Sequence, residues 1–294
     1  MNFLFFENLI FKIFNETFVF DRKKRTELKT NWVKRCLKKY VSKTINEYKH
    51  ENLEDKAPKI IWQYWHQGAE NAPELIKACF KSVEKYMPCY EQKILSFETI
   101  KDYVDIPEKY YKLLEQKKIP IAIFSDILRL HLLEKYGGIW LDSTIYLTNE
   151  LPREIIDSDF FAFKIDKELS FTKTSLKCYF IKSSSNNMFL KLIKKTIENY
   201  WNENDFLVNY FMFEHIMTMI FELSYEAKKI VDKIPYFEKA NRGMLCSKLY
   251  DKFNNNEYEE IIKNNCVHKI SYKALKNLPT KDTYYEQIIN ILNN

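Results

Sequence analysis

Glycine and proline are scarce in this sequence, at 4 and 8 of 294 residues. A flexible linker or a sandwich with many turns needs more of both, so we expect long helices and short loops. Because 46% of the residues are hydrophobic and 29% are charged, intrinsic disorder and fibrous repeats are excluded. The length fits one large globular domain, alone or with an appendage.

Cysteine pairs and long apolar runs are also missing. No two of the six cysteines have C-x-x-C spacing, so we expect reduced, mostly buried thiols and a cytosolic protein. The opening stretch up to Phe20 is apolar, but Glu7, Lys12 and Glu16 interrupt it. These charges argue against both a signal peptide and a transmembrane span.

Positive charge is concentrated near the N-terminus. The formal net charge of the whole chain is +6. Residues 1–49 contain 12 Lys and Arg against 5 Asp and Glu, a net +7, which leaves −1 for residues 50–294. We therefore expect a basic, amphipathic helical appendage at residues 1–50 and a nearly neutral domain at residues 51–294.

The appendage has the pattern of two helices. The first has a polar sector with Asn8, Lys12, Asn15 and Glu16, opposite an apolar sector with Phe3, Phe6, Leu9, Ile10, Ile13 and Phe14. After the basic run Arg22–Arg25, the second helix repeats apolar residues at every fourth position among lysines and arginines: Val33, Leu37, Val41 and Ile45.

This pattern predicts that residues 1–49 bind an anionic membrane surface, with aromatic side chains in the interface and basic ones at the headgroups. The alternative is that both apolar stripes dock on the main domain and the charges face solvent. Nucleic-acid binding is a third possibility for a basic stretch, but no recognised module accompanies the charge, so we expect no nucleic-acid partner.

From Pro58 onward, strand and helix signals alternate. We expect strands at 59–65, 93–97, 139–141, 145–147, 160–165 and 176–181, with a late β-prone residue at Val267. Helices are expected at 73–86, 107–116 and 120–136, and over most of 186–223. The alternation predicts an α/β fold with a mainly parallel central sheet, and ligands bind such sheets beyond the carboxyl ends of the strands.

The segment 124–144 is the most informative part of the sequence. Asp126 and Arg129 lie three residues apart on one helix, so a carboxylate and a guanidinium can point at one ligand. Gly137 and Gly138 then turn the chain into a short buried strand, and Asp142 follows at its carboxyl end. Taken singly, these residues could form an intrahelical ion pair and a turn cap, but together they predict a ligand site.

These residues resemble a known family. Four segments carry the resemblance: A-P-K-I-I-W-Q-Y-W at 57–65, S-D-I-L-R-L at 125–130, Y-G-G-I-W-L-D-S-T at 136–144 and H-K-I-S-Y-K at 268–273. They are similar to motifs of the sugar transferases with a D-x-D motif, which include yeast initiating mannosyltransferases and clostridial glucosylating toxins. The resemblance is closest to the bacterial capsular polysaccharide synthesis branch and covers about residues 58–273 in the same order.

The resemblance implies a GT-A-like, Rossmann-type mixed sheet flanked by helices. It also implies transfer of a sugar from a nucleoside diphosphate sugar to a glycan or lipid-linked glycan, with retention at the anomeric carbon. A retaining transfer of this type needs placed charges and an oriented acceptor hydroxyl more than a protein nucleophile. A glycosidase with two carboxylates is a competing use of Asp126 and Asp142, but it explains neither the Gly-Gly turn nor the late His-Lys pair.

Roles follow from the resemblance residue by residue. Trp62, Gln63 and Tyr64 would lie near the nucleotide, and Asp126 and Arg129 would hold the donor sugar and ribose. The D-x-D motif corresponds to Asp142, Ser143 and Thr144, all expected to bind the donor. His268 and Lys269 would contact the diphosphate, so the expected catalytic set is Asp126, Arg129, Asp142, His268 and Lys269.

Thr144 replaces the second acid of the motif, which bears on the metal ion. Mn²⁺ or Mg²⁺ on a diphosphate prefers carboxylate ligands, and a neutral hydroxyl is a poor substitute. Two routes remain open at this point. Asp142 holds the ion with a second ligand such as His268, or cationic side chains replace the metal.

The sequence therefore predicts a nucleotide-sugar glycosyltransferase of the hexosyltransferase type that builds a capsular or other surface polysaccharide. We expect it in the cytoplasm, peripheral on the inner face of the plasma membrane. The alternative is a non-catalytic, membrane-associated sugar- or nucleotide-binding assembly protein on the same fold.

Overall fold

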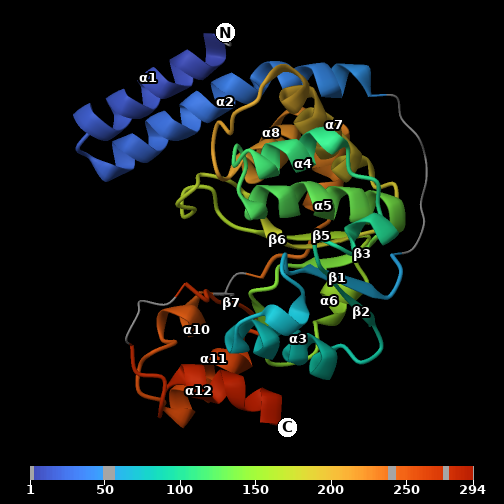
Figure 1. Cartoon of the computed structure of the whole chain (residues 1–294), viewed down its shortest axis with the longest axis vertical. Coiled ribbons are helices and arrows are strands. Elements are labelled where there is room, and N and C mark those ends of the chain that lie inside the picture. Colours follow the sequence, from blue (N-terminus) through green and yellow to red (C-terminus); the bar gives the residue numbers. More distant parts are fainter. Residues whose placement is uncertain (1–2, 49–56, 238–242, 274–277, 294) are drawn as a thin grey trace.

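A computed structural model describes residues 3–48, 57–237, 243–273 and 278–293 (Figure 1). The boundary expected at residue 50 falls in residues 49–56, outside the described residues. The first half of the chain contains α1 (Phe3–Phe18), α2 (Arg22–Glu47), β1 (Ile60–Tyr64), α3 (Glu74–Tyr86), β2 (Glu91–Leu95), α4 (Glu108–Glu115), α5 (Ile121–Tyr136), β3 (Gly138–Leu141) and β4 (Ile145–Leu147). The second half contains α6 (Arg153–Ile156), β5 (Phe160–Lys164), β6 (Leu176–Ser183), α7 (Met188–Glu203), α8 (Met212–Leu223), α9 (Tyr225–Asp232), α10 (Met244–Ser247), α11 (Asn255–Asn264), β7 (Val267–Lys269) and α12 (Tyr284–Ile289).

The central sheet has five strands in the order β2-β1-β3-β6-β5. Strand β1 is parallel to both β2 and β3, whereas β6 is antiparallel to both β3 and β5. The α/β fold with a mixed sheet is confirmed: β1, β2, β3 and β5 run in one direction, as the expectation of a mainly parallel sheet requires, and β6 alone of these five strands runs against them. No helix lies between β5 and β6, and a connection without a crossover helix joins antiparallel strands.

Helices cover both faces of this sheet. Figure 1 shows α4, α5, α7 and α8 above it, with α2 outermost, and α3 below it. A second, two-stranded sheet pairs β4 with β7, and the helices α10 to α12 gather near it and α3. These C-terminal helices and α3 share a separate apolar cluster that includes Leu75, Tyr146, Leu249, Ile270 and Tyr284.

The turn from α5 into β3 depends on its two glycines. Both have positive φ, at +70° for Gly137 and +99° for Gly138, where other residues are strained. A Cβ on Gly138 would also lie 2.6 Å from the carbonyl oxygen of Ile60 in β1. Only glycine therefore lets β3 start beside β1 directly after the helix, and this places the carboxyl end of β3 at the predicted site.

The two N-terminal helices are present as expected, but they pack differently. The apolar stripe of α2 is buried in the main core through Val33, Cys36, Leu37, Tyr40 and Val41. Helix α1 lies along α2 at the edge of the molecule (Figure 1). Among the described residues, no helix has the length and apolar character needed to cross a membrane. All six cysteines are free thiols, but the expectation that most are buried is wrong: Cys36 and Cys79 are buried, Cys89 is exposed and the other three are half-buried.

Candidate functional site

Asp126, Arg129 and Asp142 meet as the sequence predicts. Nη2 of Arg129 lies 3.0 Å from Oδ1 of Asp126 and donates to Oδ1 of Asp142 at 2.9 Å. Asp142 directly follows β3, and its backbone N–H donates to the carbonyl oxygen of Tyr179 in β6 at 2.9 Å. The helix α5 and the strand β3 thus bring two carboxylates to one guanidinium at the carboxyl end of the strand.

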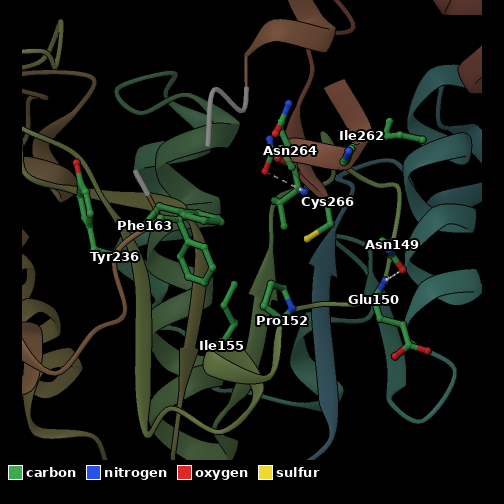
Figure 2. A pocket seen from close by; sticks show the side chains of 13 residues that line it. Asn149, Glu150, Pro152, Ile155, Phe163, Tyr236, Ile262, Asn264 and Cys266 are labelled. Carbon is green, nitrogen blue, oxygen red and sulfur yellow. Dashed lines mark hydrogen bonds between the residues drawn. The ribbon is translucent and has the colours of Figure 1, made fainter. Parts of the chain in front are cut away.

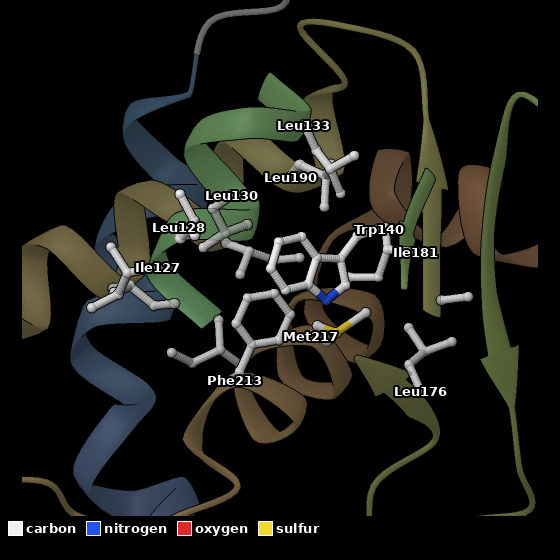
Figure 3. Close-up of a cluster of buried hydrophobic side chains, with 14 of the residues drawn as sticks. Ile127, Leu128, Leu130, Leu133, Trp140, Leu176, Ile181, Leu190, Phe213 and Met217 are labelled. Carbon is white, nitrogen blue, oxygen red and sulfur yellow. The ribbon is translucent and has the colours of Figure 1, made fainter. Parts of the chain in front are cut away.

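Trp140 fixes the direction of the Asp142 carboxylate. Its indole is 1% exposed and is surrounded by apolar side chains from α5, β6, α7 and α8, including Leu133, Ile181, Leu190 and Met217 (Figure 3). The indole N–H donates to Oδ1 of Asp142 at 2.9 Å. Because a buried N–H needs an acceptor, the packing of Trp140 also holds Asp142 in place.

Lys269 completes the site from a distant part of the chain. β7 is antiparallel to β4, and this pairing sets Lys269 opposite Ile145. Nζ of Lys269 lies 2.6 Å from Oδ2 of Asp142 and donates to the hydroxyl of Thr144, also at 2.6 Å. The ammonium therefore joins the first and third positions of the D-x-D-like motif.

The two carboxylates have opposite pKa shifts. Burial raises the pKa of Asp126 to about 7, although Arg129 opposes this, and the charge of Asp142 adds to the rise. Burial also acts on Asp142, but the Lys269 ammonium and the Arg129 guanidinium outweigh it and lower its pKa below the usual value. Asp142 is therefore ionised at neutral pH, whereas Asp126 holds a proton in a large share of molecules.

Arg129 is a positioning residue. The whole residue is 2% exposed, and Nη1 donates to the carbonyl oxygen of Cys178 at 2.7 Å. Its guanidinium carbon lies 5.0 Å from the ring centre of Trp140 and 5.4 Å from that of Phe213. Both terminal nitrogens of Arg129 are engaged. The buried guanidinium therefore orients the carboxylates of Asp126 and Asp142.

The structure does not bring His268 to Asp142. His268 is fully buried, and its Nε2 lies 3.0 Å from the hydroxyl of Thr148. Successive side chains alternate across a strand, so His268 and Lys269 point to opposite faces of β7. Burial lowers the pKa of His268 to about 4, so it is a neutral residue packed inside the protein.

The three residues expected near the nucleotide are likewise buried in β1. The indole N–H of Trp62 donates to the carbonyl oxygen of Gly137 at 2.9 Å, so Trp62 is 1% exposed beneath the α5–β3 turn. Oε1 of Gln63 accepts from Gln92 at 2.7 Å. The Tyr64 hydroxyl lies 2.7 Å from Nδ1 of His66. None of the three presents a free face, whereas Ser143 and Thr144 lie half-buried in the turn after β3.

Aromatic residues to which the sequence analysis assigned no role lie beside the site. Trp65 follows β1, and its ring centre lies 5.3 Å from that of Tyr272, three residues beyond Lys269. In the described part of the chain, the indole N–H of Trp65 is buried without a hydrogen-bond partner. The ring centre of Tyr179 lies 5.4 Å from Nζ of Lys269. These contacts could not be predicted from local sequence patterns, because residues 65 and 272 are far apart in the sequence.

Tyr210 is an exposed aromatic residue that the charges of the site influence. It is 53% exposed, and its ring packs against Phe211 at 5.1 Å. Partial burial and the charges of Asp126 and Asp142 raise the pKa of its hydroxyl. An exposed aromatic ring next to a charged site offers a surface on which a sugar can stack.

A divalent metal does not fit the residues at this site. Asp142 is the one acid in its motif, Thr144 is neutral, and an ammonium already lies between them. Across the described ranges, no group of three or more His, Cys, Asp or Glu residues could hold a metal ion. The groups that meet here are one carboxylate, one hydroxyl and one ammonium, whereas Mg²⁺ in proteins prefers carboxylate and other oxygen ligands.

A pocket of about 540 Å³ lies at the other end of the β4–β7 ladder (Figure 2). Its walls come from the segment after β4, from β5 and from the segment that leads into β7, and they include Asn149, Pro152, Phe163, Asn264 and Cys266. Asp126, Arg129, Asp142 and Lys269 are not among its lining residues. This pocket is therefore separate from the charged site.

Comparisons with known proteins give a family and a distant structural likeness. The family described as "Capsular polysaccharide synthesis protein" matches residues 15–288. No curated protein matches the chain. Among solved structures, the chain is similar to one titled "PaToxG Glycosyltransferase", at 15% sequence identity and a TM-score of 0.44, over 82% of this chain and 95% of that chain. A likeness this distant says nothing of what this chain binds.

Proposed function

The chain belongs to the capsular polysaccharide synthesis protein family, and from that membership we propose that it is a retaining glycosyltransferase that uses a nucleoside diphosphate sugar. The acceptor we propose is a growing capsular or other surface polysaccharide, free or lipid-linked. The observation that carries the proposal is the ammonium of Lys269, held 2.6 Å from both Asp142 and Thr144 at the carboxyl end of β3.

The charges at the site suit an anionic donor. Lys269 and Arg129 supply two positive charges, and Asp142 supplies one negative charge. Burial raises the pKa of Asp126 to about 7, so in many molecules its carboxyl is protonated and carries no charge. The cluster then has a net positive charge, and a diphosphate entering a partly desolvated site is attracted to it.

In the proposed reaction, the bond between the anomeric carbon and the β-phosphate oxygen breaks, and its electron pair stays with the phosphate. An acceptor hydroxyl oxygen bonds to the anomeric carbon on the same face, and its proton passes to the departing phosphate oxygen. Lys269, whose side chain is 33% exposed, stabilises the charge on that leaving group. Asp126 and Asp142 orient the donor through its hydroxyl groups.

Trp65 and Tyr272 extend the proposal to the nucleotide. β1 runs parallel to β3 with Trp62 opposite Trp140, so Tyr64 is level with Asp142, and Trp65 lies one residue beyond. Rings at this end of the sheet can stack on a base, and the unpartnered indole N–H of Trp65 can donate to it. We therefore propose Trp65 and Tyr272 in the role expected of Trp62, Gln63 and Tyr64.

The test is release of nucleoside diphosphate from a panel of UDP, GDP and dTDP sugars by the full chain. We expect release from at least one donor, and loss of at least about 100-fold in Asp142→Asn and Lys269→Met, because each removes a group that holds or stabilises the reacting charge. Lys263→Met, at the other end of the β4–β7 ladder, is the control and keeps the activity. Equal release by all four proteins would contradict the proposal.

A non-catalytic sugar- or nucleotide-binding assembly protein is the second candidate. It is favoured by one observation: both oxygens of Asp142 are already engaged by protein groups, and Thr144 offers no second acid. This candidate predicts that the nucleoside diphosphate sugar binds but is not consumed. Calorimetric titration with the same panel, followed by analysis of the recovered ligand, separates the two.

A further inference from the structure

Helix α1 packs on α2 with its polar side. The side-chain oxygen of Asn8 accepts from the indole N–H of Trp32 at 2.9 Å, and the side-chain amide of Asn15 donates to the carbonyl oxygen of Arg25 at 3.4 Å. Both asparagines are buried. Phe11 adds a stacked contact with Trp32 at 4.9 Å. Asn8 and Asn15 of the sector expected to face water thus form the contact between the helices, whereas Lys12 and Glu16 of that sector are exposed.

The apolar sector of α1 faces outward as a result. The exposed large apolar residues of α1 and the turn after it are Phe5 (41%), Leu9 (45%), Ile10 (67%), Ile13 (56%), Phe14 (50%), Phe18 (66%) and Phe20 (88%). The side chain of Phe3, assigned to the same sector, lies outside the described residues. A contiguous apolar face of this kind is costly in water unless something covers it.

The apolar stripe of α2, by contrast, is already covered. Val33, Leu37 and Val41 are at most 1% exposed and belong to the main core, and Lys34 pairs with Glu222 at the end of α8. The sequence predicted that both helices bind a membrane, but their apolar residues lie in different environments. Helix α2 attaches α1 to the domain, and only α1 keeps a free apolar face.

The charges next to this face identify what covers it. The exposed basic residues Arg22, Lys23 and Lys24 follow Phe20 after Asp21, and exposed Lys12 lies on α1 itself. Asp21, within this run, accepts from the backbone N–H of Lys24 and caps α2. Apolar side chains beside clustered ammonium and guanidinium groups complement acyl chains beneath anionic headgroups. A second copy of this face would bring the same basic residues and no acidic cluster to pair with them.

We propose that the outer face of α1 and the basic turn after it, residues 9–24, bind an anionic phospholipid surface. Helix α1 lies in the plane of the interface, with Ile10, Ile13 and Phe14 below the headgroups and Arg22 to Lys24 among them. Figure 1 shows the α1–α2 turn projecting from one side of the molecule, so it can reach a flat surface before the body does. The inference goes beyond the proposed reaction and does not depend on it.

Co-sedimentation of the full chain with vesicles tests this inference. We expect binding to vesicles of equal parts phosphatidylcholine and phosphatidylglycerol, and much weaker binding to phosphatidylcholine alone. The double variant Ile10→Ser and Ile13→Ser should bind about tenfold less tightly, because two exposed apolar side chains no longer enter the lipid. Leu223→Ser with Leu292→Ser, two exposed leucines outside α1 and α2, is the matched control and should bind like the wild type.

A charge variant tests the basic turn separately. Lys23→Glu with Lys24→Glu should weaken binding to the anionic vesicles about 30-fold or more, at about 1 kcal/mol for each lysine lost. Lys228→Glu with Lys233→Glu makes the same change in net charge on and just after α9, away from α1, and should have little effect. Nucleoside diphosphate release in solution should not change in any of these variants, so failure here is distinct from failure of the proposed reaction.

Two results would overturn the inference. One is equal vesicle binding by the wild type and both α1 variants. The other is a wild-type dimer in light scattering that the Ile10→Ser and Ile13→Ser variant converts to a monomer without any change in vesicle binding. Deletion of residues 1–49 is not the appropriate test, because it would remove α2 and expose the main core.

Discussion

Lys269 and Asp142 form an ion pair at 2.6 Å, although 127 positions separate them in the sequence. The pair exists because β7 returns antiparallel to β4, with Lys269 opposite Ile145. The same ammonium donates to Thr144, where the related D-x-D sequence has its second acid. We propose that Lys269 takes the place of a metal ion, in which case a second acid is not needed at residue 144.

If the Lys269 ammonium occupies the position of a metal ion, substitutions at residues 144 and 269 should create a metal site. We expect that Thr144→Asp combined with Lys269→Met binds Mn²⁺, because two carboxylates then face a space that the ammonium has left. Thr144→Asp alone should bind no Mn²⁺, since the new carboxylate pairs with Lys269. Electron paramagnetic resonance of titrated Mn²⁺ measures this directly. Mn²⁺ binding by the wild type that Asp142→Asn abolishes would show the interpretation of Lys269 to be wrong.

Arg129→Met should destabilise the protein by about 3 kcal/mol. The substitution leaves Asp126 and Asp142 without the buried guanidinium that neutralises them, which is the costly way to break a buried ion pair. Lys118→Met breaks an exposed pair with Asp205 and should cost less than about 1 kcal/mol. Urea denaturation of the two variants makes the comparison, and similar losses in both would contradict the central position of Arg129.

Asp126 should make the folded state less stable as pH rises. Its pKa is about 7 in the folded protein against 3.8 as the ordinary value, so between these values the folded state holds a proton that the unfolded chain has released. Asp126→Asn removes this term, and its stability relative to the wild type should therefore increase from about pH 4 to pH 7. Urea denaturation over that range provides the test.

The difference between the two proteins is the quantity to measure in that experiment. Burial lowers the pKa of His131, His215 and His268 to about 4, and buried neutral histidines stabilise the fold increasingly as pH rises through the same range. These opposing contributions are common to wild type and variant. A difference that stays constant with pH would mean that Asp126 is ionised throughout.

Tyr210→Ala should raise the KM for one of the two substrates about tenfold while leaving the free energy of unfolding within about 0.5 kcal/mol. The ring is more exposed than buried, so its loss removes a contact surface for substrate and little of the core. Tyr225→Ala, which removes a 72% exposed tyrosine at the start of α9, is the control. Steady-state kinetics of both variants would show whether the effect is specific to Tyr210.

The charged centre of the site could be predicted from the sequence, because its signals are local. Asp126 and Arg129 share a helix, the glycine pair places β3, and Asp142 ends that strand. Lys269 came from the resemblance of a late segment. His268 belongs to the same segment, but strand alternation turns it away from Asp142, and periodicity alone does not say which of two neighbours faces a site.

Other features depend on packing that the sequence pattern does not specify. An aromatic run at a strand predicts β1, but not that Trp62 is buried under Gly137 while Trp65 reaches Tyr272. Likewise, periodicity identifies the apolar sector of α1 but not the surface it meets. Buried hydrogen bonds from Trp32 and to Arg25 turn the asparagine side inward and leave the apolar side free.

Binding of nucleoside diphosphate in the presence and absence of metal is the most direct test of the site. UDP and GDP are titrated calorimetrically into the full chain in EDTA and again with Mn²⁺. The account predicts binding of at least one of them in EDTA, no gain with Mn²⁺, and affinity at least about tenfold weaker in Lys269→Met than in the Lys263→Met control. Binding that requires Mn²⁺, or that Lys269→Met leaves unchanged, would contradict it.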